Sequence, residues 1–282
     1  MEVIHRAAEF RDACEAARAG GRTVGFVATM GSFHEGHLSL IRRAREERDI
    51  VAVSVFVNPL QFGPHEDFEA YPRDLDRDLD LARKQGVDLV FAPTVEEMYP
   101  AGQPAVTVDP GPLAERLEGA IRPGHFRGVA TVVAKLLHVV GPSTAYFGEK
   151  DAQQLAIVRR MVRDLSFPVD IAGCPIVREP DGVAMSSRNA FLSPGEREAA
   201  SCLSRGLSKA QAQFATGERT ADPLLTPLRT AVDEEPLAAL DYAVLVDEES
   251  FDEVQEVTRP TRALVAARVG KPRLIDNIPL IP

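Results

Sequence analysis

The sequence predicts an α/β fold, with a parallel sheet over residues 1–177 and a smaller α+β part over residues 178–282. In the first part, short apolar runs alternate with amphipathic stretches, which is the order that produces parallel strands joined by helices. Long polar loops follow the apolar runs, at the ends where such sheets bind ligands. After about Val177 the alternation stops, and we place the boundary near the segment CPIVREPDG.

The expected strands are nearly continuous apolar runs, which are typical of a sheet covered on both faces. In the first part they comprise residues 22–29, 49–59, 87–93, 143–151 and 169–177, the fourth broken at Gly148. Two more are expected at residues 240–250 and 261–270.

The expected helices show apolar residues at spacings of three and four. One example is the apolar set Leu38, Leu40, Ile41 and Ala44, which is interspersed with arginines. The opening MEVIHRAAEFRDACEAARAGG is expected to be charged and helical and not a secretion signal. Ser193-Pro194 is a start signal for a long helix over 193–218. The other expected helices span residues 78–86, 126–142, 151–168 and 221–235.

Composition excludes several classes of protein. The net charge of −10 disfavours general binding to nucleic acid or to anionic membranes. No apolar run approaches the roughly 20 residues of a membrane helix. The three cysteines are scattered without a C-x-x-C pair, which predicts neither a disulfide framework nor a zinc ribbon. We therefore expect a cytoplasmic protein with reduced thiols.

Two histidines stand where the first expected strand turns into a helix, in the segment TMGSFHEGH. Helix N-termini favour anions, so His34 and His37 suggest a phosphate site. The alternatives are a capping histidine beside a solvated one, or a metal pair. The spacing is one residue short of the H-E-x-x-H zinc-protease motif.

The second polar loop, FVNPLQFGPHEDFEAYPRDLDRD, offers Asn58 and Gln61 just past a strand. Amides donate and accept at once, which suits a hydroxylated carboxylate substrate, although loop amides often bond their own backbone. An acidic run follows, and most of it is expected to be a solvated helix face, with at most one or two members approaching a magnesium ion. The run comprises Asp74, Asp76, Asp78 and Asp80.

Two further loops carry cationic groups. IRPGHFRGV places Arg122, His125 and Arg127 around a glycine turn, and arginine suits planar anions. YFGEKDAQQ places Lys150 and Asp151 at a strand end, where lysine can bind phosphate and aspartate can bind ribose. A surface salt bridge between Lys150 and Asp151 would account for the presence of these two residues about as well.

The segment DGVAMSSRNAFLSP combines hydroxyl groups with a guanidinium group in a glycine-containing loop. Ser186, Ser187 and Arg188 would form an anion-binding nest with backbone amides. Ser187 could instead only cap a turn.

The segments TMGSFHEGH and AMSSRN resemble the HIGH-like and KMSKS-like signatures of the nucleotidyltransferase superfamily. With FVNPLQFGPHEDFEAYPRD, GHFRGVATVV, YFGEKDAQQL, VREPDGVAMSSRN and RLIDN, they resemble the pantothenate synthetase (pantoate–β-alanine ligase) family. The resemblance runs from about Thr29 to Phe191, with RLIDN near the end.

This resemblance implies a reaction in which pantoate and ATP give pantoyl adenylate and pyrophosphate. β-Alanine then attacks, AMP is released, and pantothenate is formed for coenzyme A biosynthesis. The resemblance also implies magnesium, a Rossmann-like first domain, a smaller second domain carrying the KMSKS-like loop, and a homodimer.

The resemblance also assigns site residues. His34, His37, Lys150 and Arg188 are the implied catalytic residues. The implied ATP-binding residues are Met30, His34, His37, Gly148, Lys150, Asp151, Val177, Ser186, Ser187 and Arg188. Gln61, Gln154 and Asn58 would bind pantoate, and Arg122 would lie near pyrophosphate. Asp78 would bind magnesium, although Arg77 stands beside it where the family commonly has an acidic residue.

Three alternatives remain. Another nucleotidyltransferase could adenylate a different small acid, or place AMP or CMP on a phosphorylated acceptor. A pocket for a phosphorylated acceptor should carry extra basic residues, whereas the second loop offers Asn58 and Gln61. A tRNA synthetase fragment is disfavoured by the acidic charge and by the lack of an evident anticodon domain. A binding module without catalysis would tolerate loss of His34, Lys150 or Arg188, and all three are present.

Overall fold

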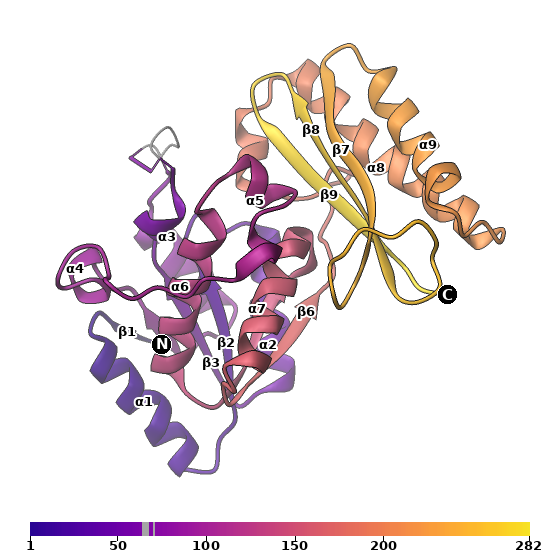
Figure 1. Cartoon of the computed structure of the whole chain (residues 1–282). Helices are drawn as coiled ribbons and strands as arrows, with labels where there is room; N and C mark the ends of the chain where they lie inside the picture. The colour runs from indigo at the N-terminus through magenta and orange to yellow at the C-terminus, as the bar shows by residue number, and fades with distance from the viewer. Residues whose placement is uncertain (64–67, 70) are drawn as a thin grey trace. The chain divides into compact units, whose positions relative to one another are not determined.

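The computed structural model describes residues 1–63, 68–69 and 71–282; residues 64–67 and 70, part of the second polar loop, lie outside the described residues (Figure 1). The chain divides into two compact units. The first comprises Met1–Glu149 and Gln153–Pro175, and the second comprises Lys150–Ala152 and Ile176–Pro282. The sequence predicts one boundary after residue 177, whereas in the structure Lys150–Ala152 group with the second unit.

Within the described residues, the first unit contains a six-stranded parallel sheet in the order β1-β4-β3-β2-β5-β6. Its strands are β1 (Glu2–Ile4), β2 (Val24–Thr29), β3 (Ile50–Val55), β4 (Leu89–Phe91), β5 (Ser143–Gly148) and β6 (Val169–Cys174). The strand order reverses between β2 and β5, and open α/β sheets bind ligands beyond the carboxyl ends of the strands at such a switch point. The loops after β2, β3 and β5 lie at this edge.

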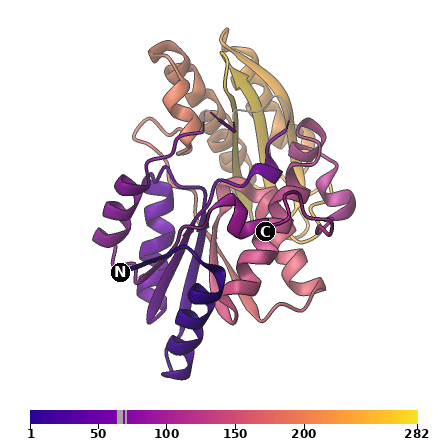
Figure 2. The same cartoon turned by 90° about the vertical axis from the view of Figure 1, so that its left-hand side faces the viewer.

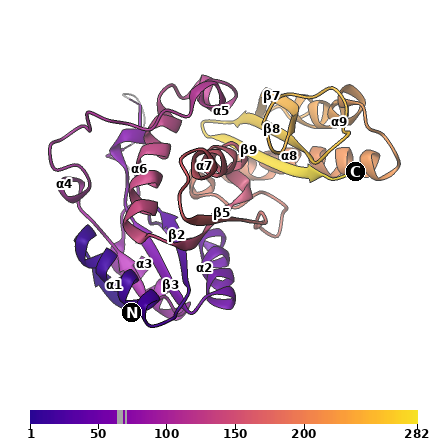
Figure 3. The ribbon, with the colours of Figure 1, turned by 60° about the horizontal axis from the view of Figure 1, so that its bottom comes forward.

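Helices cover both faces of this sheet (Figures 2 and 3). Residues in a strand alternate between faces, so Phe26 packs with α1, α6 and α7, and Val27 packs with α2 and α3. Figure 3 shows α1 and α6 on one side of β2 and β3 and α2 on the other. The helical segments of this unit are α1 (Ala7–Ala19), α2 (Glu35–Glu47), η1 (Pro59–Gln61), α3 (Leu75–Lys84), α4 (Val95–Met98), η2 (Gly111–Ala114), α5 (Glu118–Ile121), α6 (His125–Val140) and α7 (Ala152–Asp164), the last beginning in the second unit.

The second unit packs two helices against an antiparallel sheet of order β7-β8-β9, counted over the described ranges. Alternate residues of β8, including Ala263 and Val265, join leucines of both helices in one apolar core. The elements are η3 (Glu149–Asp151, mostly in this unit), η4 (Ser187–Phe191), α8 (Pro194–Ala215), α9 (Ala221–Asp233), β7 (Ala238–Asp247), β8 (Thr261–Val269) and β9 (Arg273–Leu280).

The structure confirms the predicted fold class, a Rossmann-like α/β sheet with a smaller α+β unit. Three details differ. The opening is not helical throughout, because Glu2–Ile4 pair in parallel with Leu89–Phe91 as β1. The segment containing RLIDN is the strand β9, which the sequence did not predict. The short helices α4 and α5 were also not predicted.

Candidate active site

The loop after β2 presents the two histidine side chains in a defined tautomer. His34 caps α2, and its Nδ1 accepts a hydrogen bond from the Gly36 N–H at 3.1 Å. Nδ1 of His37 accepts from the His34 N–H at 3.4 Å. A neutral ring whose Nδ1 accepts carries its proton on Nε2, so this hydrogen-bond network assigns an Nε2–H donor to both histidines. Their ring centroids are 4.1 Å apart, so the two rings lie next to each other.

The buried carboxylate of Asp78 supports this loop by accepting hydrogen bonds from its backbone. Asp78 of α3 is 1% exposed, and its two oxygens accept from the N–H groups of Ser32 and Phe33 at 2.7 Å each. Ser32 has a positive φ of 54°, a backbone conformation that non-glycine residues rarely adopt without such support. Gly31 precedes it with φ 80°, and a Cβ there would lie 2.8 Å from the Asp78 Oδ2. Asp78 therefore fixes the backbone that leads to His34.

The magnesium role predicted for Asp78 does not fit this geometry. Both oxygens already accept backbone hydrogen bonds, and a protein-bound magnesium ion usually keeps several water ligands. A side chain that is 1% exposed leaves no room for them. Among the described residues, no group of three or more His, Cys, Asp or Glu side chains could hold a metal ion. The rest of the acidic run is exposed, with Asp74 capping α3.

The loop after β3 contains two amides with different environments. Asn58 is 1% exposed and fully hydrogen-bonded, because Nδ2 donates to Gln61 and Gly128 and Oδ1 accepts from Leu60 and Tyr99. These four bonds use its whole hydrogen-bonding capacity. Burial raises the pKa of Tyr99, which keeps its hydroxyl protonated as the donor to Asn58.

The Gln61 amide connects the loop after β3 to the loop after β2. Its Nε2 lies 2.8 Å from the Met30 sulfur, and its Oε1 accepts from Asn58 at 3.3 Å. Counting only the residues that the structure describes, Gln61 keeps one amide hydrogen and one oxygen lone pair beyond these contacts. The structure brings Met30, Asn58 and Gln61 together as one cluster at the carboxyl ends of neighbouring strands.

The predicted arginine and histidine of the third loop meet this cluster. The His125 Nδ1 lies 2.8 Å from the Gln61 carbonyl oxygen, and Nε2 lies 2.9 Å from Arg122 Nη1. A carbonyl only accepts and a guanidinium only donates, so the His125 proton is on Nδ1. Arg127 instead pairs with Asp109 at the surface.

Gly148 and Gln154 are the predicted residues of the fourth loop that belong to the first unit. In the part of the chain that the structure describes, no side-chain hydrogen bond joins Gln154 to the other predicted residues, and Gly148 is the last residue of β5. Gln154 is partly buried in the first turn of α7. Its neighbour Gln153 is 4% exposed and is used internally, donating to the carbonyls of Leu113 and Arg116.

In the second unit, a hairpin carries the serine-rich loop. Val177 accepts from the Met185 N–H at 2.9 Å, and Gly182 makes the turn with φ 89°. Arg197 of α8 pairs with Glu179 and Asp181, and these hydrogen bonds hold the pKa of both carboxyl groups below the ordinary value. Both carboxylates therefore stay charged near neutral pH and fix the hairpin to α8.

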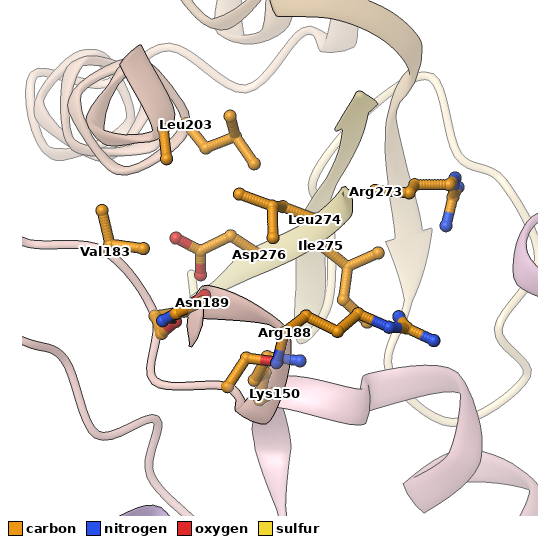
Figure 4. A pocket seen from close by; sticks show the side chains of 12 residues that line it. Lys150, Val183, Arg188, Asn189, Leu203, Arg273, Leu274, Ile275 and Asp276 are labelled. Carbon is orange, nitrogen blue, oxygen red and sulfur yellow. Dashed lines mark hydrogen bonds between the residues drawn. The ribbon is translucent and has the colours of Figure 1, made fainter. Parts of the chain in front are cut away.

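Lys150 and the serine-rich loop line one small cavity of the second unit (Figure 4). Ser186, Arg188, Asn189 and Asp276 also line it. Its volume of about 10 Å³ admits about one water molecule, so the cavity itself cannot hold a nucleotide. In Figure 4, Asp276 points toward Asn189, and Arg273 points to the other side of β9.

The predicted residues of this unit differ in their contacts. Ser186 accepts from the Arg188 N–H at 3.3 Å and caps η4, whereas Ser187 is the first residue of that turn and does not line the cavity. Lys150 Nζ lies 3.7 Å from Asp151 Oδ1, so the ion pair expected as an alternative is present but long.

Sequence reasoning missed the residues that support these groups. Tyr99 and Gly128 hold Asn58, and Arg178, Arg262 and Asn277 support the second unit's loops. One signal was available for Asn277, because RLIDN places two polar residues inside an otherwise apolar stretch.

Comparison with known proteins identifies the family. A sequence model described as pantoate-beta-alanine ligase matches residues 2–279. The chain belongs to the pantoate-beta-alanine ligase family. It is 56% identical over 277 residues to the pantothenate synthetase of Roseiflexus sp. (strain RS-1), covering 98% of each chain. This membership makes the chain an enzyme of the ligase class in pantothenate biosynthesis.

Solved structures agree with this family. The chain resembles the crystal structure of pantothenate synthetase from Thermus thermophilus, with a TM-score of 0.92, 49% identity and full coverage of both chains. It also resembles the pantoate-beta-alanine ligase of Francisella tularensis complexed with beta-gamma ATP and beta-alanine. That match has a TM-score of 0.79 and 33% identity, covering 99% of this chain and 97% of the other. A search of the described helices finds none that is long and apolar enough to cross a membrane.

Proposed function

We propose that the chain condenses pantoate with β-alanine in two steps that use ATP. The pantoate carboxylate attacks the α-phosphorus of ATP, forming pantoyl adenylate and expelling pyrophosphate. The β-alanine amine then attacks the acyl carbon and loses a proton, and AMP leaves with the bonding electrons. A free carboxylate is a poor electrophile, so activation has to precede attack by the amine.

The observation that carries this proposal is the contact between Gln61 and Met30. It places an uncharged amide, suited to a hydroxy acid, beside the loop that carries His34 and His37. The two Nε2–H donors of the histidines are suited to the charge that develops on phosphate oxygens. The Francisella tularensis relative, complexed with beta-gamma ATP and beta-alanine, supports these ligands.

We assign the remaining residues within this proposal. Lys150, Ser186, Ser187 and Arg188 bind the triphosphate, and Arg122 binds the departing pyrophosphate. Met30, Gly148, Asp151 and Val177 contact the nucleoside, and Gln61 and Gln154 bind pantoate. Asn58, whose hydrogen bonds are all internal, positions Gln61. Magnesium would arrive with the phosphates of ATP, which is the usual mode for this ion.

Product analysis tests the proposal. The protein is incubated with ATP, Mg²⁺, pantoate and β-alanine, and we expect AMP and pantothenate in equal amounts. Formation of ADP and phosphate would indicate an acyl phosphate intermediate and would contradict the proposal. AMP formation only with a different acid would favour the alternative of another adenylating enzyme.

We also propose a cytoplasmic homodimer. The resemblance to the family supports the dimer, which light scattering tests by the mass of the particle. The three cysteines are free and buried, as suits a reducing compartment. A monomeric mass at assay concentration would contradict the dimer.

A further inference from the structure

The last strand of the second unit holds a buried amide against the backbone of Lys150. Asn277 of β9 is 2% exposed, and its Nδ2 donates to the Lys150 carbonyl oxygen at 3.1 Å. Lys150 lies in η3, a three-residue 3-10 turn, whose hydrogen bonds have poorer geometry than those of an α-helix. Its side chain is only 18% exposed, so the position of the backbone largely decides where its amine lies.

A buried arginine fixes the orientation of this amide. Arg262 of β8 is 4% exposed and donates from Nη1 to the Asn277 Oδ1 at 2.7 Å. Because a guanidinium has no acceptor, the amide oxygen must face Arg262, and the NH₂ group must face Lys150. Arg262 is held in turn by Glu248, at 2.8 Å from Nη2. Glu248, Arg262 and Asn277 thus form a chain that ends on Lys150.

The neighbouring residue Asp276 holds a different segment. It receives two hydrogen bonds from Arg178, at 2.6 and 3.0 Å, and Arg178 also donates to the Gly182 carbonyl at 3.1 Å. Successive strand residues point to opposite faces. The pair Asp276–Asn277 therefore supports the hairpin before Ser186 with one side chain and Lys150 with the other.

We propose that Asn277 is a positioning residue for Lys150, acting through the Lys150 carbonyl to place the amine. This inference rests on the proposed function, in which Lys150 binds the triphosphate. Asn277 itself touches no substrate in this account.

An isosteric substitution isolates this contact. In Asn277→Asp the carboxylate still accepts from Arg262, but it has no donor and presents an acceptor to the Lys150 carbonyl. We expect the rate of pantoate-dependent pyrophosphate exchange to fall between about tenfold and a hundredfold, the range expected for a misplacement of about 1 Å. The KM for pantoate should stay close to the unsubstituted value, and the rate is measured at a temperature where thermal unfolding shows that the variant remains folded, because a buried acceptor facing another acceptor lowers stability.

Two further variants act as controls. Asn277→Ala also lacks the donor but adds no charge. If its exchange rate falls by a similar factor at a temperature where the variant remains folded, the effect is due to the lost donor. Glu248→Gln keeps an acceptor for Arg262 and should keep the full rate. A full rate in both Asn277 variants would overturn the proposal.

A double-mutant cycle separates positioning from a general structural role. In a Lys150→Ala background, Asn277→Asp should change the exchange rate by less than about twofold, because coupled residues are not additive. If Asn277→Asp lowers the exchange rate by the same factor in both backgrounds, the proposal is overturned while the proposed function stays intact. A full rate in Lys150→Ala alone would instead contradict the triphosphate role of Lys150, and the positioning role would fall with it.

Discussion

Replacing Asp78 by asparagine tests whether this residue supports the histidine loop or binds metal. The two carboxylate oxygens accept from the backbone N–H groups of Ser32 and Phe33 at 2.7 Å. Asparagine offers one oxygen and one NH₂ group, so in either orientation a donor faces a donor. One hydrogen bond to a charged group, worth about 1.5–3 kcal/mol, is lost, and a buried N–H is left unsatisfied.

We expect a loss of about 2–4 kcal/mol in the free energy of unfolding of the first unit. At about 2–4 °C per kcal/mol for a unit of this size, the melting temperature should fall by about 5–15 °C. The matched control is Asp76→Asn, on the same helix but exposed, which should change stability by less than about 0.5 kcal/mol.

The assay combines thermal unfolding with a magnesium titration of the exchange reaction. In Asp78→Asn the exchange rate should fall about a hundredfold because the loop carrying His34 shifts. The magnesium concentration that gives half the maximal rate should not change. An unchanged melting temperature with a raised magnesium requirement would refute our reasoning and restore a metal role for Asp78.

The remaining predictions concern single residues of the candidate site. Lys150→Ala and His37→Ala should each lower turnover at least about a hundredfold, because donors aimed at developing charge contribute about 10²–10³ in rate. Gln61→Ala should raise the KM for pantoate far more than that for ATP, since it removes an interaction worth about 1–3 kcal/mol. Gly128→Ala should destabilise the protein by about 1–3 kcal/mol and raise the KM for pantoate. The reason is that the added Cβ would lie 2.2 Å from the Leu60 carbonyl oxygen and displace the turn that carries Gln61.

Circular dichroism and steady-state kinetics check these variants. A folded Lys150 or His37 variant with a near-normal rate would mean that the phosphates are misplaced in our account. Equal changes in both KM values for Gln61→Ala would count against its contact with pantoate. For Gly128→Ala the control is Gly21→Ala in a surface turn with nothing within 4 Å of its Cβ, which should leave the KM for pantoate unchanged.

The sequence predicted the parallel sheet because the strands are buried on both faces and leave a continuous apolar run. It missed β1, since three residues are too short to show a period and only their pairing with Leu89–Phe91 defines them. It missed β9 because Asp276 and Asn277 interrupt the apolar pattern. Their burial depends on Arg178 and Arg262, which are distant in the chain.

The candidate site was predictable where a residue type implies its chemistry. His34, Gln61 and Lys150 stand in the segments that follow β2, β3 and β5, so the order of the elements predicts the loops that carry them. What each acidic or amide group contacts could not be predicted. Both Asp78 oxygens accept backbone hydrogen bonds and Asn58 is fully hydrogen-bonded, in each case by partners that only the folded chain brings near.

The most direct test of the central claim is exchange of labelled pyrophosphate into ATP in the absence of β-alanine. If pantoyl adenylate forms as a separate step, label should enter ATP when pantoate and Mg²⁺ are present, because the first half-reaction is then reversible on its own. Exchange that required β-alanine would contradict a free-standing adenylation step. Exchange without pantoate would point to a different acid and contradict the substrate that we propose.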